Sequence, residues 1–419
     1  MKSARVLIAA GVTLAAAVTV SMSHHVASGP ATPNSFDAST VSALTCPGVS
    51  QHLGNDVTTL RVVNLARSER TMATSLDGTT TQRTRHLRAT HSVMETLPAT
   101  STMTTFRADV YGGGVSGALY GGGQLSPCSH TGERNWWVSG LSTLAHQSAT
   151  LILANPAATS AVVSVTAFTA SGVLTPGADQ GVTIAGGRSV AINISSQIVG
   201  EANAALKVQV ASGRVVARLI EGTPGGSLRG ILLGGALSRD LAWGNVPTSG
   251  IATINGFNPS DQVVSVSATV LMTDYRIAPV TMTAYPHSAF SLRVIPSTGV
   301  PSVGIAAIEM HASGAIAATL RDGISAMSLV ASSGTPLTSG THLILNAAGH
   351  PSGVVQIIGG GSVTAHAFGG AELSVSGPAS RYRVRTMTGA GSATLTSRQP
   401  IAVFYATGVA TAEVALDGR

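Results

Sequence analysis

Short runs in which apolar and polar residues alternate recur along most of the chain, separated by glycine, serine, proline and asparagine. An alternation with a period of two is typical of β-strands with one buried face. Such strands are predicted, for example, at Ala161–Phe168, Gly181–Ile184 and Ser189–Ile194. The 3.5- or 3.6-residue spacing of long helices is missing. The pattern therefore predicts an all-β protein.

One arrangement of strands occurs four times. Each copy starts with a strand that ends at an asparagine, and these strands are Thr59–Asn64, Thr150–Asn155, Ala252–Asn258 and Thr341–Asn346. Proline follows two of the asparagines, and the pair Asn-Pro starts turns because asparagine bonds its own backbone and proline fixes φ. We therefore interpret the asparagines as turn residues.

Each copy ends with two short strands that we predict to form a hairpin closed by glycine. The paired arms are Phe106–Tyr111 with Val115–Tyr120, Leu206–Val210 with Val215–Ile220, Ile308–His311 with Ala315–Leu320, and Ala393–Thr396 with Pro400–Tyr405. Another apolar run follows in the last three copies, at Gly230–Leu233, Met327–Ala331 and Ala412–Leu416. These runs pair either within their own copy or with the next one.

Six or seven short strands per copy are typical of a β-sandwich. The expected fold is a series of tandem Ig-like antiparallel β-sandwich modules after an N-terminal signal or anchor segment. The expected boundaries are 1–28 for that segment, 29–45 for a flexible linker, and 46–135, 136–235, 236–335 and 336–419 for four modules.

The composition agrees with a folded β protein and excludes other classes. Only 10% of the residues are charged, against about 25% in typical proteins, and the mean hydropathy is +0.33. Disordered chains show the opposite balance. The 48 glycines follow no strict period, which excludes a collagen helix.

The N-terminus carries two positive charges, Lys2 and Arg5, before an apolar run from Val6 to Val20. This is the pattern of a signal peptide, and cleavage and retention as a membrane anchor both remain open. We expect an exported protein, extracellular or at the cell surface. In that compartment Cys46 and Cys128 are expected to form one disulfide. They do not make a zinc site, because no His-rich pair lies near them.

The net charge is +6, and arginine supplies nearly all of the positive charge. Six arginines lie close together in the first copy, namely Arg61, Arg67, Arg70, Arg83, Arg85 and Arg88. Such a patch is suited to an anionic glycan, a teichoic-type polymer or lipid headgroups. The competing interpretation is a solvated strand face. Nucleic acid is not expected as a partner, because no recognition motif occurs.

Catalytic motifs are missing from the sequence. Neither Gly-x-Ser-x-Gly nor His-Glu-x-x-His occurs. Gly112, Gly114 and Gly117 match a phosphate-binding spacing, but no helix follows them, so we interpret them as turn residues. Carboxylates and histidines are scattered. We predict no catalytic, cofactor-binding or metal-binding residue.

Trp136, Trp137 and Trp243 are the only tryptophans, and two of them precede the first strand of a copy. One interpretation makes them packing plugs between modules. The alternative is a sugar-binding platform, since flat aromatic rings stack on pyranose rings.

Several short motifs resemble an uncharacterised actinobacterial family of exported proteins, domain of unknown function 5719. They are Cys46-Pro47-Gly48, Pro127-Cys128, Trp136-Trp137-Val138-Ser139-Gly140, and Leu151-Ile152-Leu153-Ala154-Asn155-Pro156, followed by Val-rich strands with Gly between them. The resemblance implies export and architecture but no chemistry.

The leading hypothesis is a non-enzymatic, secreted or membrane-anchored envelope protein that acts as a scaffold or interaction surface. Its partner would be an envelope protein or a cell-wall polymer, with membrane contact only through the N-terminal segment. The alternatives are a binder of wall glycan or anionic polymer, and an envelope hydrolase. The sequence predicts neither a cofactor nor an oligomeric state.

Overall fold

We analysed a computed structural model of the chain. It describes residues 41–46, 59–76, 83–89, 91–96, 105–111, 115–121, 124–129, 132–169, 172–223, 228–247, 251–272, 276, 278–294, 305–323, 330–345, 352–375, 381–389, 391–407 and 410–413. The predicted signal or anchor segment and most of the predicted linker lie outside the described residues. No helix within the described ranges is long and apolar enough to cross a membrane.

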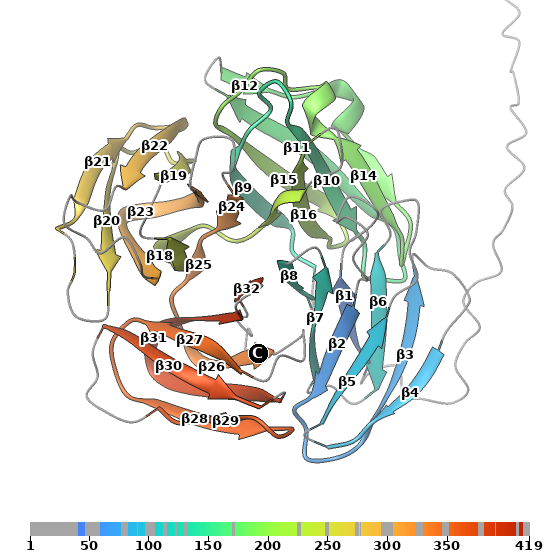
Figure 1. The fold of residues 1–419 in the computed structure, drawn as a ribbon. Coiled ribbons are helices and arrows are strands. Elements are labelled where there is room, and N and C mark those ends of the chain that lie inside the picture. Colours follow the sequence, from blue (N-terminus) through green and yellow to red (C-terminus); the bar gives the residue numbers. More distant parts are fainter. Residues whose placement is uncertain are drawn as a thin grey trace, which may run out of the picture. The chain divides into compact units, whose positions relative to one another are not determined.

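The first repeat consists of two antiparallel sheets, drawn in blue and teal in Figure 1. Its strands are β1 (Val41–Cys46), β2 (Thr59–Asn64), β3 (Arg70–Leu76), β4 (Arg83–Leu87), β5 (Ser92–Thr96), β6 (Phe106–Tyr111), β7 (Val115–Gly121) and β8 (Gln124–Pro127). One sheet has the order β1-β6-β3-β4, and the other has the order β5-β2-β7-β8. The two sheets enclose an apolar core.

The remaining strands repeat this plan. In the second repeat they are β9 (Asn135–Leu141), β10 (Ser148–Ala154), β11 (Ala161–Thr169), β12 (Gly172–Leu174), β13 (Val182–Ile184), β14 (Ser189–Asn193), β15 (Ala204–Ser212), β16 (Val216–Gly222) and β17 (Leu228–Leu233). In the third they are β18 (Ser238–Pro247), β19 (Ile251–Asn258), β20 (Val264–Leu271), β21 (Val280–Ala284), β22 (Ser288–Val294), β23 (Ile305–Gly323), β24 (Val330–Ser333) and β25 (Thr335–Pro336). In the fourth they are β26 (Thr338–Leu345), β27 (Ser352–Ile358), β28 (Val363–Phe368), β29 (Glu372–Leu373), β30 (Tyr382–Thr388), β31 (Ser392–Thr407) and β32 (Ala410–Glu413).

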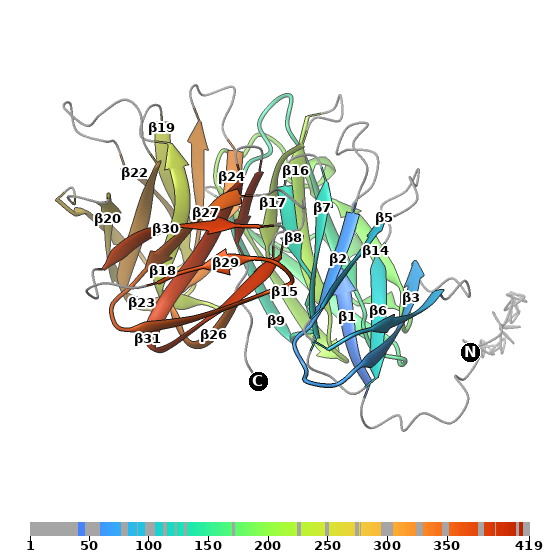
Figure 2. The ribbon, with the colours of Figure 1, turned by 60° about the horizontal axis from the view of Figure 1, so that its bottom comes forward.

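Strand pairing confirms the all-β class and the antiparallel sandwich. In the second repeat, β9-β15-β11-β12 forms one sheet and β14-β10-β16-β17 the other, with β13 also on β11. The eight-strand plan places four strands in each sheet, whereas an Ig constant domain places four and three. Figure 2 shows the strands from a second direction.

The predicted closing hairpins are wrong. β6 pairs with β1 and β3, whereas β7 pairs with β2 and β8, so the two arms lie in different sheets. In the third repeat a single strand, β23, makes both sets of pairings, first with β18 and β20 and then with β19. The Ser-Gly segment thus carries the chain from one sheet to the other, as strands do at the corners of sandwiches.

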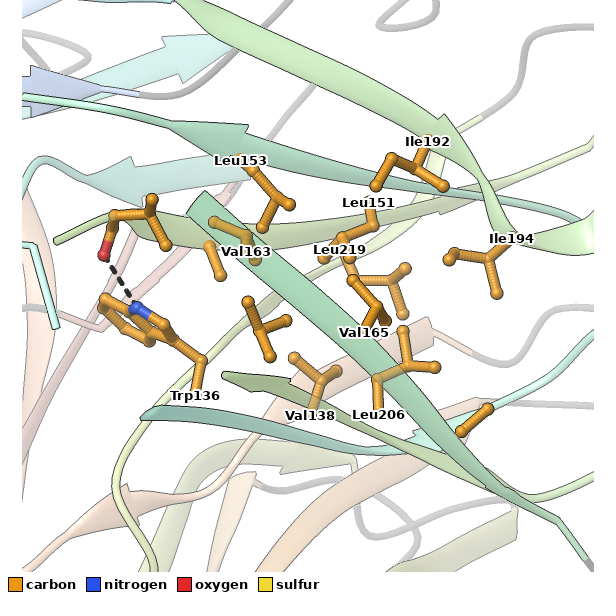
Figure 3. Close-up of a cluster of buried hydrophobic side chains, with 14 of the residues drawn as sticks. Trp136, Val138, Leu151, Leu153, Val163, Val165, Ile192, Ile194, Leu206 and Leu219 are labelled. Carbon is orange, nitrogen blue, oxygen red and sulfur yellow. Dashed lines mark hydrogen bonds between the residues drawn. The ribbon is translucent and has the colours of Figure 1, made fainter. Parts of the chain in front are cut away.

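Each repeat has its own apolar core between its two sheets. In the second repeat, Leu151 and Leu153 of one sheet face Val163 and Val165 of the other (Figure 3). The strands of the two sheets differ in pattern. β11 alternates between buried and half-buried residues, whereas all of Val216–Glu221 in β16 are buried. A strand buried along its whole length has neighbours on both faces.

The disulfide between Cys46 and Cys128 is present and joins the end of β1 to the residue after β8. Thr45 and Ser129 exchange backbone hydrogen bonds beside it, at 2.8 and 2.9 Å. The predicted linker is wrong for residues 41–45, because they form β1 and pair along β6. Leu44 in this strand is fully buried in the core.

A buried asparagine closes the second strand in three repeats. Asn155 donates from Nδ2 to the carbonyl oxygens of Thr159, Ile184 and Ala185 at 2.7, 3.0 and 3.3 Å. Its Oδ1 accepts from the N–H of Ala157 at 3.0 Å. Asn64 and Asn258 make the same set of bonds. The interpretation of these asparagines as turn residues is confirmed.

The fourth repeat departs from the predicted alignment. Thr341 lies in β26, which pairs with the first part of β31 and so takes the place of a first strand. The second strand is β27, which pairs with the second part of β31. Gly359, at φ +110°, follows it where the other repeats have asparagine. The strand predicted as equivalent to β2, β10 and β19 is therefore the strand before the correct one. Asn346 lies outside the described residues.

The extra apolar runs, which contribute to β17, β24 and β32, join the repeats, because they pair both within their own repeat and with another one. β17 pairs with β16 in its own repeat and runs parallel to β24 of the third repeat. β32 pairs with β31 and runs parallel to β8 of the first repeat. The fourth repeat also shares an apolar cluster with the first, where Leu343 packs against Val63 and Ala118. Contacts therefore connect the last repeat back to the first.

We predict that Asn155→Ala lowers the free energy of unfolding by about 2–3 kcal/mol, because three buried carbonyl groups lose their donor. Asn135, whose side chain is exposed in β9, gives the matched control, and Asn135→Ala should change stability by less than about 0.5 kcal/mol. Urea unfolding of the two variants measures the difference. Equal stability of both variants would contradict the role of the asparagine.

Candidate functional site

The structure separates the six arginines of the first repeat by burial. Arg67, Arg83, Arg85 and Arg88 are exposed, and Arg70 is half-buried. Arg61 is only 4% exposed, so its assignment to a ligand surface is wrong. Its Nη2 donates to Ser92 Oγ at 2.8 Å, and burial lowers its pKa while the nearby Tyr405 opposes that shift. We call the four exposed residues, Arg67, Arg83, Arg85 and Arg88, the arginine edge.

Two members of the arginine edge lie on β4, the last strand of its sheet. Arg83 pairs with Thr74 and Arg85 with Met72, so both side chains lie on the face that carries the core residue Met72. The side chain of Glu95, on β5 of the other sheet, is 6% exposed and lies 3.5 Å from Arg83 Nη1 and 3.7 Å from Arg85 Nε. The carboxylate of Glu95 therefore forms ion pairs with both guanidinium groups and links the two sheets on this side of the sandwich.

The other two members flank the turn at Asn64. Asn64 Nδ2 donates to the carbonyl oxygen of Arg88 at 3.2 Å and to that of Ser68, the neighbour of Arg67, at 2.9 Å. The buried asparagine thus holds together two loops that carry exposed arginines. Glu69, the second carboxylate nearby, contacts His86 at 3.1 Å.

The second and third repeats lack this charged edge. The fourth strand has the sequence Arg-Thr-Arg-His-Leu in the first repeat. In the second it is split into Gly-Val-Leu and Val-Thr-Ile, and in the third it is Val-Thr-Met-Thr-Ala. The sandwich therefore forms without arginines at this place, and its architecture does not require them.

The tryptophans do not form an exposed platform. Trp136 belongs to the core of the second repeat, where Nε1 donates to the carbonyl oxygen of Val215 at 2.7 Å (Figure 3). Trp243 is 1% exposed in the core of the third repeat. Trp137 stacks on Phe257 of the third repeat, with 5.7 Å between ring centroids. Trp136 and Trp243 are buried, so the assignment of these two to a ligand surface is wrong, and the half-buried Trp137 fits the plug interpretation.

A buried ion pair joins the second and third repeats. Arg321 of β23 donates from Nη2 to both carboxylate oxygens of Glu221 in β16, at 2.8 Å each, and the two side chains are 8% and 4% exposed. Arg321 also donates through Nε to the carbonyl oxygen of Gly140 at 2.9 Å. Glu221 accepts from the N–H of Ser142 at 2.9 Å. The pair thus holds the end of β9 against β23.

Gly140 allows this close approach. Its φ is +73°, and a Cβ built there would lie 2.8 Å from Cβ of Thr319. Thr319 Oγ1 donates to the carbonyl oxygen of Ser139 at 2.6 Å. Sequence inspection missed this junction, although a charged residue at the end of an apolar strand, as in Ile220-Glu221 and Leu320-Arg321, is a signal for a buried pair.

The same strands carry two further charged groups, the buried Arg218 and the half-buried Asp322. Burial lowers the pKa of Arg218 to about 9, which leaves the guanidinium charged at neutral pH. Burial raises the pKa of Asp322 to about 6, although a hydrogen bond to its own backbone opposes the shift.

Acidic and histidine residues form only isolated pairs in the part of the chain that the structure describes. His287 and Asp261 approach to 2.6 Å, as do His311 and Asp240, and all four side chains are at least half exposed. Within the same ranges no three His, Cys, Asp or Glu residues come together in a way that could hold a metal ion.

The fold and these residues define a class, that of all-β proteins built from repeated antiparallel sandwiches with a disulfide in the first repeat. A family of unknown function, DUF5719, matches residues 77–323, which is more than half of the chain. The chain therefore belongs to this family, as its short motifs suggested. No curated protein matches the chain.

The buried ion pair yields one prediction. Glu221→Gln and Arg321→Met should each lower the free energy of unfolding by about 3 kcal/mol, because each leaves a buried charge without its partner. The double variant should lose less than the sum, with a coupling energy above about 1 kcal/mol. The exposed pair Arg214 and Glu133, 3.9 Å apart, is the matched control and should couple by less than about 1 kcal/mol. If the losses of stability add up in the Glu221–Arg321 pair as they do in the control pair, the two buried charges are not coupled and the prediction is wrong.

The raised pKa of Asp322 yields a second prediction. Between about pH 4 and pH 6 the folded chain binds more protons at this residue than the unfolded chain does. The free energy of unfolding should therefore fall as the pH rises through this window, by about 1 kcal/mol per pH unit at most. Asp322→Asn should remove this fall. Urea unfolding at pH 4.5 and at pH 6.5 gives the two free energies of unfolding to compare. The exposed control Glu372→Gln should keep it, and an unchanged slope in Asp322→Asn would contradict the assignment.

Proposed function

We propose that this protein is an exported, non-enzymatic envelope protein that acts as an interaction scaffold, and that the arginine edge binds an anionic polymer of the envelope. The observation that carries the proposal is the exposure of four arginines on β4 and in the two loops that Asn64 holds together. Guanidinium groups recognise phosphate and carboxylate oxygens in pairs and always carry charge. A polymer with repeated anionic groups can contact several of them at once.

The charge balance at the edge supports an anionic partner. Four arginines stand beside two carboxylates, Glu95 and Glu69, and Glu69 is engaged by His86. The side chains of Arg83 and Arg85 are 69% and 43% exposed, so their outer N–H groups are open to a ligand. Because these charges are exposed, binding should weaken strongly as salt rises.

Export is supported by the disulfide and by the N-terminal sequence pattern. Disulfides form and persist in oxidising compartments outside the cytosol, and Cys46 and Cys128 are joined in the first repeat. The other three repeats supply a framework in which buried pairs such as Arg321 and Glu221 hold neighbouring sandwiches together. This combination suits a protein that presents one charged surface rather than one that performs a reaction.

We predict that the full chain binds poly(glycerol phosphate) at low salt and loses it at high salt. Arg67→Gln with Arg88→Gln should weaken binding about fivefold or more, since each exposed charged contact contributes up to about 1 kcal/mol. These two are chosen because Arg83 and Arg85 also neutralise the buried Glu95. Titration by a fluorescence or calorimetric method gives the affinities.

Arg239→Gln with Arg398→Gln is the matched control, since it removes the same charge from exposed positions in other repeats. It should weaken binding less than twofold. No retention of polymer at low salt would overturn the proposal, and so would equal weakening by the two double variants. Equal binding of a neutral glycan would point instead to recognition of the sugar.

A further inference from the structure

The fourth repeat contains a second cluster of arginines, on β30. In this strand Arg383 pairs with Ile357 and Arg385 with Val355. Both partners are fully buried in the core of the repeat. Paired residues of adjacent strands share a face, so the two arginine side chains lie on the face that the core occupies.

Arg383 is covered but not neutralised. It is 5% exposed, and its Nε and Nη2 are buried without a hydrogen-bond acceptor in the part of the chain that the structure describes. The carboxylate that reaches the start of this strand is Glu309 of β23, and it is held by Arg381 at 2.5 and 2.6 Å. It therefore does not serve Arg383.

The neighbouring charge makes the position of Arg383 less favourable still. Burial lowers the pKa of Arg383, and the charge of Arg385 lowers it further. Arg385 is half-buried and donates through Nη1 to the carbonyl oxygen of Val384 at 2.9 Å. Two arginines thus lie on one strand face, with their Cα atoms about 7 Å apart along the strand.

Burying guanidinium N–H groups without an acceptor is costly, because their lost hydration is not replaced by hydrogen bonds. The Nε and Nη2 atoms form one side of the guanidinium fork, which matches two oxygens of a single oxyanion. The next positive group lies two residues along, within reach of the same ion. Both of these Arg383 atoms are closed to solvent in this structure, so an ion reaches them only when the side chains over them move, which favours a small ion or a terminal group.

We propose that Arg383 and Arg385 bind a phosphate-type oxyanion on β30 of the fourth repeat. The ion would accept two hydrogen bonds from Arg383, and Arg385 would contribute charge from the side. The site is in a different repeat from the arginine edge and does not depend on the function proposed for it. Free phosphate and a phosphate group of a polymer share the required chemistry.

The test is thermal unfolding of the full chain in sodium phosphate and in sodium chloride of equal ionic strength and pH. Phosphate should raise the melting temperature by a few degrees, and the rise should saturate, because the ion binds the folded state only. Arg383→Met should abolish the rise. In chloride this variant should be at least as stable as the parent, since a buried charge has been removed.

Two further variants separate binding from other effects. Arg398→Met removes an exposed arginine of β31 and should keep the full phosphate response. Arg383→Lys keeps the charge but loses the fork, and it should weaken phosphate binding about tenfold in a calorimetric titration. This variant decides the question if Arg383→Met does not fold.

The proposal fails if phosphate and chloride give the same melting temperature, or if Arg383→Met responds to phosphate as the parent does. Competition by poly(glycerol phosphate) would identify the ligand as a group of the polymer, and its absence would identify the free ion. Arg67→Gln with Arg88→Gln should keep the phosphate response. Loss of polymer binding in that variant therefore tests the arginine edge alone.

Discussion

One sheet of each sandwich is buried on both faces, and much of the structure depends on this constraint. In the second repeat this sheet contains β10 and β16, where Leu151–Ala154 and Val216–Glu221 are buried without interruption. In the third it contains β19, where Ile254–Asn258 are buried. One face of the sheet covers the core of its own repeat, and the other meets a neighbouring repeat. Such strands have no solvent side on which to place charge.

Polar groups inside these junctions must therefore find partners within the protein. The pair Arg321 and Glu221, together with Gly140, meets this need between the second and third repeats. Between the third and fourth repeats, Gln356 accepts a hydrogen bond from the backbone of Asn245 at 2.7 Å. The low charge of the chain is a consequence, because many positions that would be solvated in a single sandwich are interior in this one.

The exposed charge that remains is unevenly distributed, and this bears on function. Arg83 and Arg85 occupy an edge strand that the second and third repeats build from uncharged residues. Arg383 is the reverse case, a covered side chain whose Nε and Nη2 have no acceptor among the described residues. These two groups of charges, one exposed and the other buried, are the basis of the two ligand sites that we propose.

The sequence by itself determined the class of the protein. Period-two alternation, glycine and serine at the turns, and a fourfold recurrence are local properties, and they predicted strands, sandwiches and repeats. The turn role of Asn155 and the pairing of Cys46 with Cys128 also followed from residue chemistry. The fourth repeat was misaligned because Gly359 replaces the asparagine on which the comparison relied.

Tertiary structure alone decided which strands pair and which residues are buried. The sixth and seventh strands look like a hairpin in sequence, because alternation and a Ser-Gly turn are the same whether a chain folds back or crosses to another sheet. Trp136 and Arg61 were candidates for a surface, yet both are buried. Burial depends on contacts between residues far apart in the chain, such as Arg321 with Glu221, and no local pattern encodes such contacts.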